Sequence, residues 1–178
     1  TAIVDRHDIA PRALERAGML QPSRRGLGFG CGREPLPAVM AARGCDVVAT
    51  DLAAEAAVAG GWTASAQHAA QLDDLNTRGI CGEDTFRKRV TFRPQDMNGI
   101  SPDLTGFDFT WSSCAFEHLG SIANGIAFVA NAMRALKPGG LAVHTTEFNL
   151  SSNLSTVESR DLVIFRKHDI EHLVRRLE

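Results

Sequence analysis

The sequence predicts an α/β protein with a doubly wound, mainly parallel sheet. Three observations lead to this fold class. Short apolar segments alternate with segments of helical periodicity along most of the chain, as in sheets whose parallel strands are joined by helices. Gly28, Gly30 and Gly32 follow the first apolar segment, where a strand must turn tightly into a helix. The next apolar segment ends in Asp51, which completes a strand–turn–helix–strand unit.

Glycines and changes of periodicity divide the N-terminal half. Apolar residues at helical spacing predict a first helix, which Gly18 ends, and Gly44 stops the helix after the glycine turn. An alanine-rich helix then ends at Gly60-Gly61. The expected elements are helices at 4–17, 35–43, 52–59 and 63–75, and strands at 25–28, 46–50 and 90–93.

The C-terminal half continues the alternation. A Ser-Ser-Cys turn closes its first strand, and Lys137-Pro138-Gly139-Gly140 terminates a long amphipathic helix. The expected elements are strands at 107–112 and 141–145, a helix at 122–136, a polar loop at 151–159, a short apolar segment at 162–165 and a last helix from about Asp169. We therefore divide the chain into an N-terminal helical segment at 1–23, a core at 24–150, and a loop with a C-terminal helix at 151–178.

The composition is that of an ordinary globular chain. The 178 residues suffice for one domain with a buried core, 44% of them are hydrophobic, and the net charge is −2. The near-neutral charge lacks the basic excess of proteins that bind nucleic acid through phosphates, and no apolar run approaches the roughly 20 residues that span a bilayer. Four cysteines without metal-ligand spacing indicate reduced thiols, and residues 1–8 show no signal-peptide pattern. We expect a cytoplasmic protein with no nucleic-acid or membrane partner.

The glycine turn and Asp51 together indicate a nucleotide-containing ligand. Glycines let a ligand lie against bare backbone, and an acid at the end of the second strand is placed to accept hydrogen bonds from two ribose hydroxyls. The dinucleotide fingerprint G-x-G-x-x-G fails in every register; from Gly28, its third glycine would be Arg33. The pattern is G-x-G-x-G instead, which disfavours a nucleotide-dependent oxidoreductase.

At this pattern the chain resembles the class I S-adenosylmethionine-dependent methyltransferases. Residues 107–112 (FDFTWS) resemble the fourth motif of that family, and residues 115–118 (AFEH) resemble the "EH" segment of its small-molecule, ubiquinone-biosynthesis-like type. Residues 136–140 (LKPGG) resemble the turn before strand five. The resemblance implies a Rossmann-like methyltransferase fold, an enzyme, and S-adenosylmethionine as cofactor, bound by the core at 24–150.

The resemblance also implies which residues contact the cofactor. Asp51 would hold the ribose and Asp96 the adenine amino group, although capping a turn is the alternative role for Asp96. The expected set is Gly28, Phe29, Gly30, Gly32, Asp51, Leu52, Asp96, Met97 and Ser112. The chain departs from the family at Gly26, where an acid two residues before the first glycine commonly holds the methionine portion. Glu34 is the candidate to replace that acid.

Two residues are candidates for a catalytic base. His118, in the EH segment, and Glu147, after strand five, could each take the proton of a hydroxyl acceptor. Packing or capping is the alternative role for His118, and His144 is expected in the core. A metal held by His118, His144 and Glu147 is chemically conceivable, but their spacing does not demand one, and we predict no metal site. The Asp-Asn pair of catechol-type enzymes is absent after strand five.

The implied reaction is methyl transfer from S-adenosylmethionine to a small-molecule acceptor, which we expect to be a hydroxyl. The Asn/Asp-Pro-Pro-Tyr/Phe motif of adenine and glutamine N-methyltransferases is absent at strand four, which argues against those acceptors. The alternative is a non-catalytic cofactor-binding or methyltransferase-like partner subunit. Trp62, Gln67 and His68 are candidates to cover the cofactor or line the acceptor pocket, or to pack a helix.

Five strands have sequence signals, whereas the class has seven in the order 3-2-1-4-5-7-6. We therefore expect the last two strands to be missing, which leaves Leu141-Ala142-Val143 on an edge open to pairing. Either the chain continues beyond residue 178, or residues 151–165 fold over that edge, or a second subunit covers it in a homodimer. We favour continuation, because 169–178 has the pattern of a helix that would feed a sixth strand.

Overall fold

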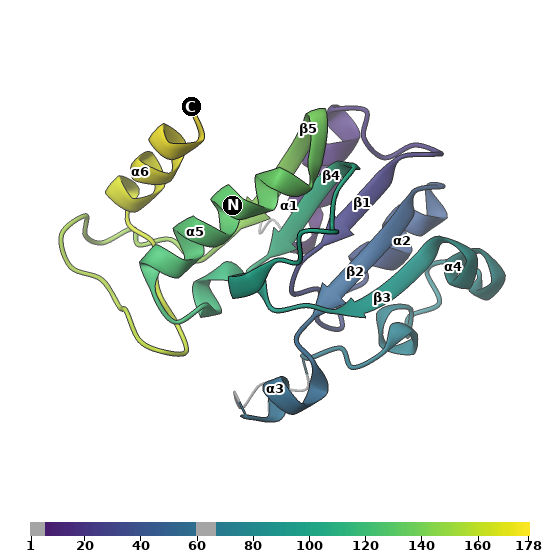
Figure 1. Ribbon diagram of the computed structural model, residues 1–178, viewed down its shortest axis with the longest axis horizontal. Helices are drawn as coiled ribbons and strands as arrows, with labels where there is room; N and C mark the ends of the chain where they lie inside the picture. The colour runs from purple at the N-terminus through teal and green to yellow at the C-terminus, as the bar shows by residue number, and fades with distance from the viewer. Residues whose placement is uncertain (1–5, 60–66) are drawn as a thin grey trace.

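The structure is a computed structural model, which describes residues 6–59 and 67–178. Within these residues the strands form one five-stranded parallel sheet in the order β3-β2-β1-β4-β5 (Figure 1). The strands are β1 (Arg25–Gly28), β2 (Asp46–Asp51), β3 (Val90–Pro94), β4 (Phe107–Ser113) and β5 (Leu136–Thr145). The predicted doubly wound α/β fold, without the last two strands, is confirmed.

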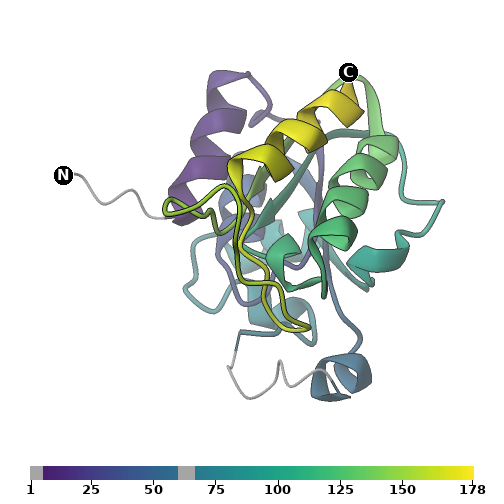
Figure 2. The same cartoon turned by 90° about the vertical axis from the view of Figure 1, so that its left-hand side faces the viewer.

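Helices cover both faces of this sheet. The α-helices are α1 (Arg6–Arg16), α2 (Leu36–Ala42), α3 (Ala54–Ala59), α4 (Glu83–Arg89), α5 (Ile122–Ala132) and α6 (Lys167–Leu177). Single 3-10 turns form η2 (Leu72–Leu75), η3 (Met97–Gly99), η4 (Phe116–His118) and η5 (Met133–Ala135). Figure 2 shows α1 on one side of the sheet and α5 on the other. None of the helices in the described ranges is both long and apolar enough to cross a membrane.

Each face of the sheet has its own core. On the side of α1, α2 and α4, the buried rings of Phe109 and Trp111 pack with Leu14, Met40 and Phe86. On the side of α5 and α6, Phe29 meets Phe128 edge to face, with ring centroids 5.2 Å apart. The two cores hold the central strands rigidly, and they leave the carboxyl ends of those strands available for a site.

The glycines inside β1 are required by the aromatic side chains of β4. A Cβ at Gly26 would lie 2.3 Å from the ring of Phe109, and a Cβ at Gly28 would lie 2.3 Å from the ring of Trp111. No side chain fits at either position, because real Cβ atoms do not approach other atoms so closely. Gly26 therefore has no room for the acid that the family commonly places there.

Three cationic or N–H groups meet on Asp108, near the start of β4. Its Oδ1 accepts from Arg24, and its Oδ2 accepts from the backbone N–H of Arg25 and from Lys137, at 2.8–2.9 Å. Burial raises the pKa of Asp108, but these donors together lower it to about 2. The carboxylate thus joins the beginnings of β1, β4 and β5.

Strand β5 begins earlier than predicted. The expected turn at 137–140 is a bulge inside β5, because the pairing shifts between Phe107↔Leu136 and Phe109↔Leu141. Gly139 has φ 78°, which suits the bulge and disfavours other residues. The predicted helix at 122–136 ends as an α-helix at Ala132 and tightens into η5.

The helix predicted at 63–75 is wrong over its described part. Residues 63–66 lie outside the described residues, and η2 is the sole helical turn from 67 to 75. Backbone groups of this segment bond elsewhere: Gln67 O accepts from Arg33 N at 2.8 Å, and Ala69 N donates to the Asp51 carboxylate at 3.1 Å. Tertiary hydrogen bonds thus replace the helical ones.

Helix α4 was missed by the sequence prediction. Acidic residues occupy its first turn and basic residues its last, and Phe86 is its buried anchor. A short helix with one apolar contact has little periodicity, so only this arrangement of charge could have indicated it.

The segment after β5 packs against η4. Val163 N donates to Glu117 O at 2.8 Å, Phe165 N donates to Glu147 O at 3.2 Å, and Phe165 pairs with Phe148 in a single bridge. Phe165 is fully buried against Phe116, with ring centroids 4.9 Å apart. The apolar segment predicted at 162–165 thus packs against η4 and the residues that follow β5.

Candidate active site

A cavity of about 470 Å³ lies at the carboxyl ends of β1, β2, β3 and β4. It sits where the strand order reverses between β1 and β4, which is where open α/β sheets bind their ligands. Its volume is within the usual range for small-molecule sites. Within the expected cofactor-binding set, the glycine and polar positions that line the cavity are Gly30, Gly32, Asp51 and Asp96.

The glycine turn forms one wall of the cavity. Gly30 and Gly32 have φ of 56° and 53°, a conformation that other residues rarely adopt. A Cβ at Gly30 would lie 2.9 Å from the Ala115 side chain, and one at Gly32 would lie 2.7 Å from Gln67 O. Glycine therefore brings bare backbone to the wall at both positions. Glu34, just beyond the turn, also lines the cavity.

Two residues before the turn are not part of the wall. Gly28 ends β1 beneath the ring of Trp111, and Phe29 is buried against Phe128. Their predicted contact with a cofactor stays a prediction.

Asp51 is the last residue of β2, and three backbone N–H groups hold its carboxylate in place. Oδ2 accepts from Gly32 N at 3.0 Å and from Ala69 N at 3.1 Å, and Oδ1 accepts from Leu52 N at 2.8 Å. Burial raises the pKa of Asp51, and the N–H of Ala69 and that of Leu52 oppose the rise. A carboxylate offers about four acceptor positions, so roughly one remains for a ligand.

The segment at 67–69 completes this wall. His68 Nε2 bonds to Leu52 O at 2.8 Å, and Leu52, Gln67 and His68 all line the cavity. Trp62, the third residue predicted to cover the site, lies outside the described residues.

Asp96 and Met97 line the opposite wall, after β3. Asp96 Oδ1 accepts from Asn98 N at 2.8 Å and so caps η3, the alternative role expected for this residue. Asp96 is nevertheless exposed at the cavity. Met97 is buried against the glycine turn, because its sulfur would lie 3.0 Å from a Cβ at Gly30.

Ser112 lies under the cavity floor. It is fully buried, and its Oγ bonds to His144 Nδ1 at 2.8 Å. Burial lowers the pKa of His144 to about 4, so the imidazole is neutral. The residues that reach the cavity from β4 are Ser113 and the two that follow, Cys114 and Ala115.

His118 and Glu147, the two predicted bases, lie differently. His118 lines the cavity, and its Nδ1 bonds to the backbone oxygen of Asp161 at 2.7 Å. A carbonyl oxygen can only accept a hydrogen bond, so the proton of this bond lies on Nδ1. Glu147 is exposed beyond β5 and does not line the cavity.

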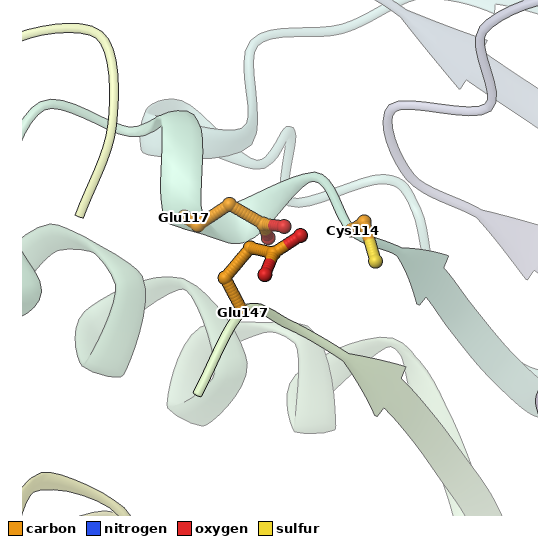
Figure 3. Close-up of side chains that lie close together, drawn as sticks. All are labelled: Cys114, Glu117 and Glu147. Atoms are coloured by element: carbon orange, nitrogen blue, oxygen red, sulfur yellow. The ribbon is translucent and has the colours of Figure 1, made fainter. Parts of the chain in front are cut away.

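The conceivable metal trio of His118, His144 and Glu147 is not brought together in the described residues, because the His144 ring bonds to Ser112 and lies against Phe116 and Phe128. The structure brings together a different set of three residues, Cys114, Glu117 and Glu147. Their ligand atoms lie within 4.8 Å of one another, just beyond the carboxyl ends of β4 and β5 (Figure 3).

Glu117 is the functional candidate that the sequence prediction missed. Its side chain is 1% exposed, and Oε2 accepts from Thr146 Oγ1 at 3.1 Å. Burial raises its pKa, and the nearby charge of Glu147 adds to the rise. The EH segment indicated His118 as the functional residue, but in η4 the buried residue of the pair is Glu117.

Comparisons with known proteins agree with this geometry. The family described as "Methyltransferase domain" matches residues 5–176. The structure of the glycopeptide N-methyltransferase MtfA is similar, with a TM-score of 0.65 at 17% identity over 97% of this chain and 79% of that one. Among curated proteins, no match to this chain was found.

Two further structures are similar. CalS10, an amino pentose methyltransferase from Micromonospora echinaspora involved in calicheamicin biosynthesis, has a TM-score of 0.62 at 18% identity, over 98% of this chain and 83% of that one. The DhpI–SAH complex has a TM-score of 0.61 at 20% identity, over 96% and 74%. At these identities the likeness shows the shared fold.

Proposed function

This chain belongs to the methyltransferase domain family, and we propose that it transfers the methyl group of S-adenosylmethionine to a hydroxyl group of a small molecule. The observation that carries the proposal is the hydrogen bond of 3.0 Å that joins the Asp51 carboxylate to the glycine turn at Gly32 N, both of which line the cavity. The structures of CalS10 and DhpI are described with the donor or SAH bound, which supports the choice of cofactor.

The walls suggest how the donor would lie. The ribose hydroxyls would bond to the remaining acceptor position of Asp51, with Leu52 beside them. The adenine would lie against Asp96 and Met97, and the methionine portion against the bare backbone of Gly30 and Gly32. Gly28, Phe29 and Ser112 would then support the site from beneath, through packing with Trp111, Phe128 and His144.

The methyl group would face the end of β4, near Ser113, Cys114 and Ala115. When bound, the donor would supply its methyl group to an acceptor oxygen, and the electron pair of the broken carbon–sulfur bond would leave with S-adenosylhomocysteine. Alignment alone can supply roughly 7–11 kcal/mol of such a barrier. His118, which lines the cavity and bonds to the Asp161 carbonyl through Nδ1, is the first candidate to take the hydroxyl proton. Glu147 is the second candidate base.

Calorimetry with S-adenosylhomocysteine and with NAD tests the cofactor. We expect binding of the first and none of the second; the reverse would overturn the proposal. Mass spectrometry of products from a panel of small hydroxyl compounds and S-adenosylmethionine then tests the acceptor. Binding without turnover on any acceptor would favour the alternative, a non-catalytic cofactor-binding or partner subunit. A cytoplasmic location, a homodimer and the 24–150 core as the cofactor-binding unit remain predictions.

A further inference from the structure

We propose that Cys114, Glu117 and Glu147 form a binding site for a divalent transition-metal ion, for which Zn²⁺ is the best match. The three side chains come from the turn after β4, from η4, and from the segment after β5. Their sulfur and carboxylate oxygens lie within 4.8 Å of one another. Figure 3 shows the two carboxylates pointing toward each other, with the sulfur beside them.

The buried carboxylate of Glu117 is an independent indication of a ligand. Oε2 is held by Thr146, whereas Oε1 is buried and has no hydrogen-bond partner among the described residues. A buried carboxylate oxygen without a partner is costly, and in native proteins it indicates an unseen water, proton or ion. Figure 3 shows the Glu117 carboxylate pointing toward that of Glu147, so a cation held between the two would compensate the charge of a side chain that is 1% exposed.

The backbone at Cys114 is strained in a way that supports the same cluster. Its φ is 46°, a left-handed conformation that is uncommon for a residue with a side chain. Thr145 holds it there, because the Cys114 N–H donates to Thr145 O at 3.0 Å and to Thr145 Oγ1 at 3.2 Å. Strain of this kind concentrates at functional sites, and here it accompanies a sulfur that lies within 4.8 Å of two carboxylates.

The donor set favours zinc over magnesium. Mg²⁺ requires oxygen ligands in octahedral geometry, whereas Zn²⁺ accepts thiolate and carboxylate together at about 2.3 Å and about 2.0–2.2 Å. Such bonds place ligand atoms about 3.5 Å apart, so the cluster must contract by about 1 Å. Glu147 is exposed and free to supply that movement by rotating its side chain. Three protein ligands leave a fourth position, as in catalytic zinc sites.

That fourth position bears on the reaction. Cys114 also lines the cavity, so the ion would lie at the cavity wall beside His118. A bound divalent ion lowers the pKa of a coordinated hydroxyl, which would make the acceptor oxygen a better nucleophile. This consequence rests on the proposed function, but the binding of the ion does not.

A shared proton is the competing explanation. The raised pKa of Glu117 would let it donate from Oε1 to Glu147 with no metal present. The two explanations differ in the role of Cys114, which a proton-sharing pair does not need.

The test is zinc binding to the chelator-treated full chain, without donor or acceptor. We expect calorimetry to show one Zn²⁺ per chain, and Co²⁺ to give the thiolate charge-transfer absorption. Cys114→Ser, Glu117→Gln and Glu147→Gln should each weaken zinc binding about tenfold or more. The matched controls Cys81→Ser and Glu171→Gln, which lie outside the cluster, should bind as the parent does.

Thermal unfolding of each metal-free variant shows whether it folds. Added Zn²⁺ should raise the melting temperature of the parent and controls more than that of the three cluster variants. If Glu117→Gln does not fold, zinc binding by Cys114→Ser and Glu147→Gln tests whether the site exists. No zinc binding by the parent, or equal binding by Cys114→Ser, would overturn the site. Either result would leave the cofactor test unaffected, because no donor is present.

Discussion

Two acids near the cavity are satisfied in opposite ways, one at the proposed donor end beside the glycine turn and one next to the proposed acceptor end at the turn after β4. Asp51, at the donor end, is half-buried and accepts three backbone N–H groups. Glu117, next to the acceptor end, is more deeply buried, and one of its oxygens has no hydrogen-bond partner in the described residues. The carboxylate of Asp51 is therefore held by the backbone, whereas that of Glu117 keeps an unused acceptor position.

The largest expected effect tests the rigidity of the donor end. Gly28→Ala places a Cβ 2.3 Å from Trp111 and 2.5 Å from the Cys31 sulfur, and should lower the free energy of unfolding by about 3 kcal/mol. Gly82→Ala is the control, since nothing lies within 4 Å of its added Cβ. Urea denaturation measures both. Equal stabilities would show that the packing beneath the glycine turn is loose.

Asp108 supplies a second fully satisfied acid for the comparison. Its folded pKa of about 2 lies below the ordinary 3.8, so its contribution is present above pH 3.8 and is lost as the pH falls toward 2. The shift corresponds to about 2 kcal/mol. Asp108→Asn should remove that acid-limb dependence in denaturation measured across pH, whereas the exposed Asp73→Asn should keep it.

The next prediction tests the proposed contact of Asp51 with the donor, through the loss of binding free energy when its carboxylate is removed. Asp51→Ala should weaken S-adenosylhomocysteine binding by about 1–3 kcal/mol, because the ribose hydroxyls lose their acceptor. Asp74→Ala is the matched control: Asp74 holds the same 67–75 segment through Ala70 N at 2.9 Å but does not line the cavity. Calorimetry that finds the two variants equal would assign the effect to loosening of the segment instead of to a ribose contact.

The smallest expected effect is a gain in stability from a substitution at Glu117, whereas Gly28→Ala lowers stability. The raised pKa of Glu117 means that metal-free protein loses stability as the pH rises above about 4.5, since the folded state then loses a proton that it binds more tightly. Glu117→Gln should flatten that dependence and raise stability at neutral pH by about 1 kcal/mol. A loss of stability at neutral pH would show that the carboxylate is satisfied, and the contrast between the two ends would fail.

The sequence predicted the donor end better than the acceptor end, for a physical reason. Gly30, Gly32 and Asp51 occupy strand ends that local spacing identifies, and all three line the cavity. Gly28 was predicted to contact the ligand. In the structure a glycine is required there by the Trp111 ring, which lies against it only because β1 and β4 pair. Local pattern cannot distinguish a glycine needed by a ligand from one needed by a ring.

The acceptor end depends on contacts between distant segments. Glu117 and Glu147 meet because β4 and β5 end side by side, and the burial of Glu117 depends on the 157–165 segment folding over η4. The helix predicted at 63–75 is wrong over its described part, 67–75, for a similar reason, since the backbone there bonds to Arg33 after the glycine turn and to Asp51. No periodicity in the sequence records such bonds.

A crystal structure with S-adenosylhomocysteine tests the central claim most directly. We predict density in the cavity with the ribose hydroxyls on Asp51, the adenine beside Asp96 and Met97, and the sulfur facing the turn at Cys114. A ligand bound elsewhere, or one whose ribose lies at the Cys114 end, would contradict the division of the cavity into a donor end and an acceptor end.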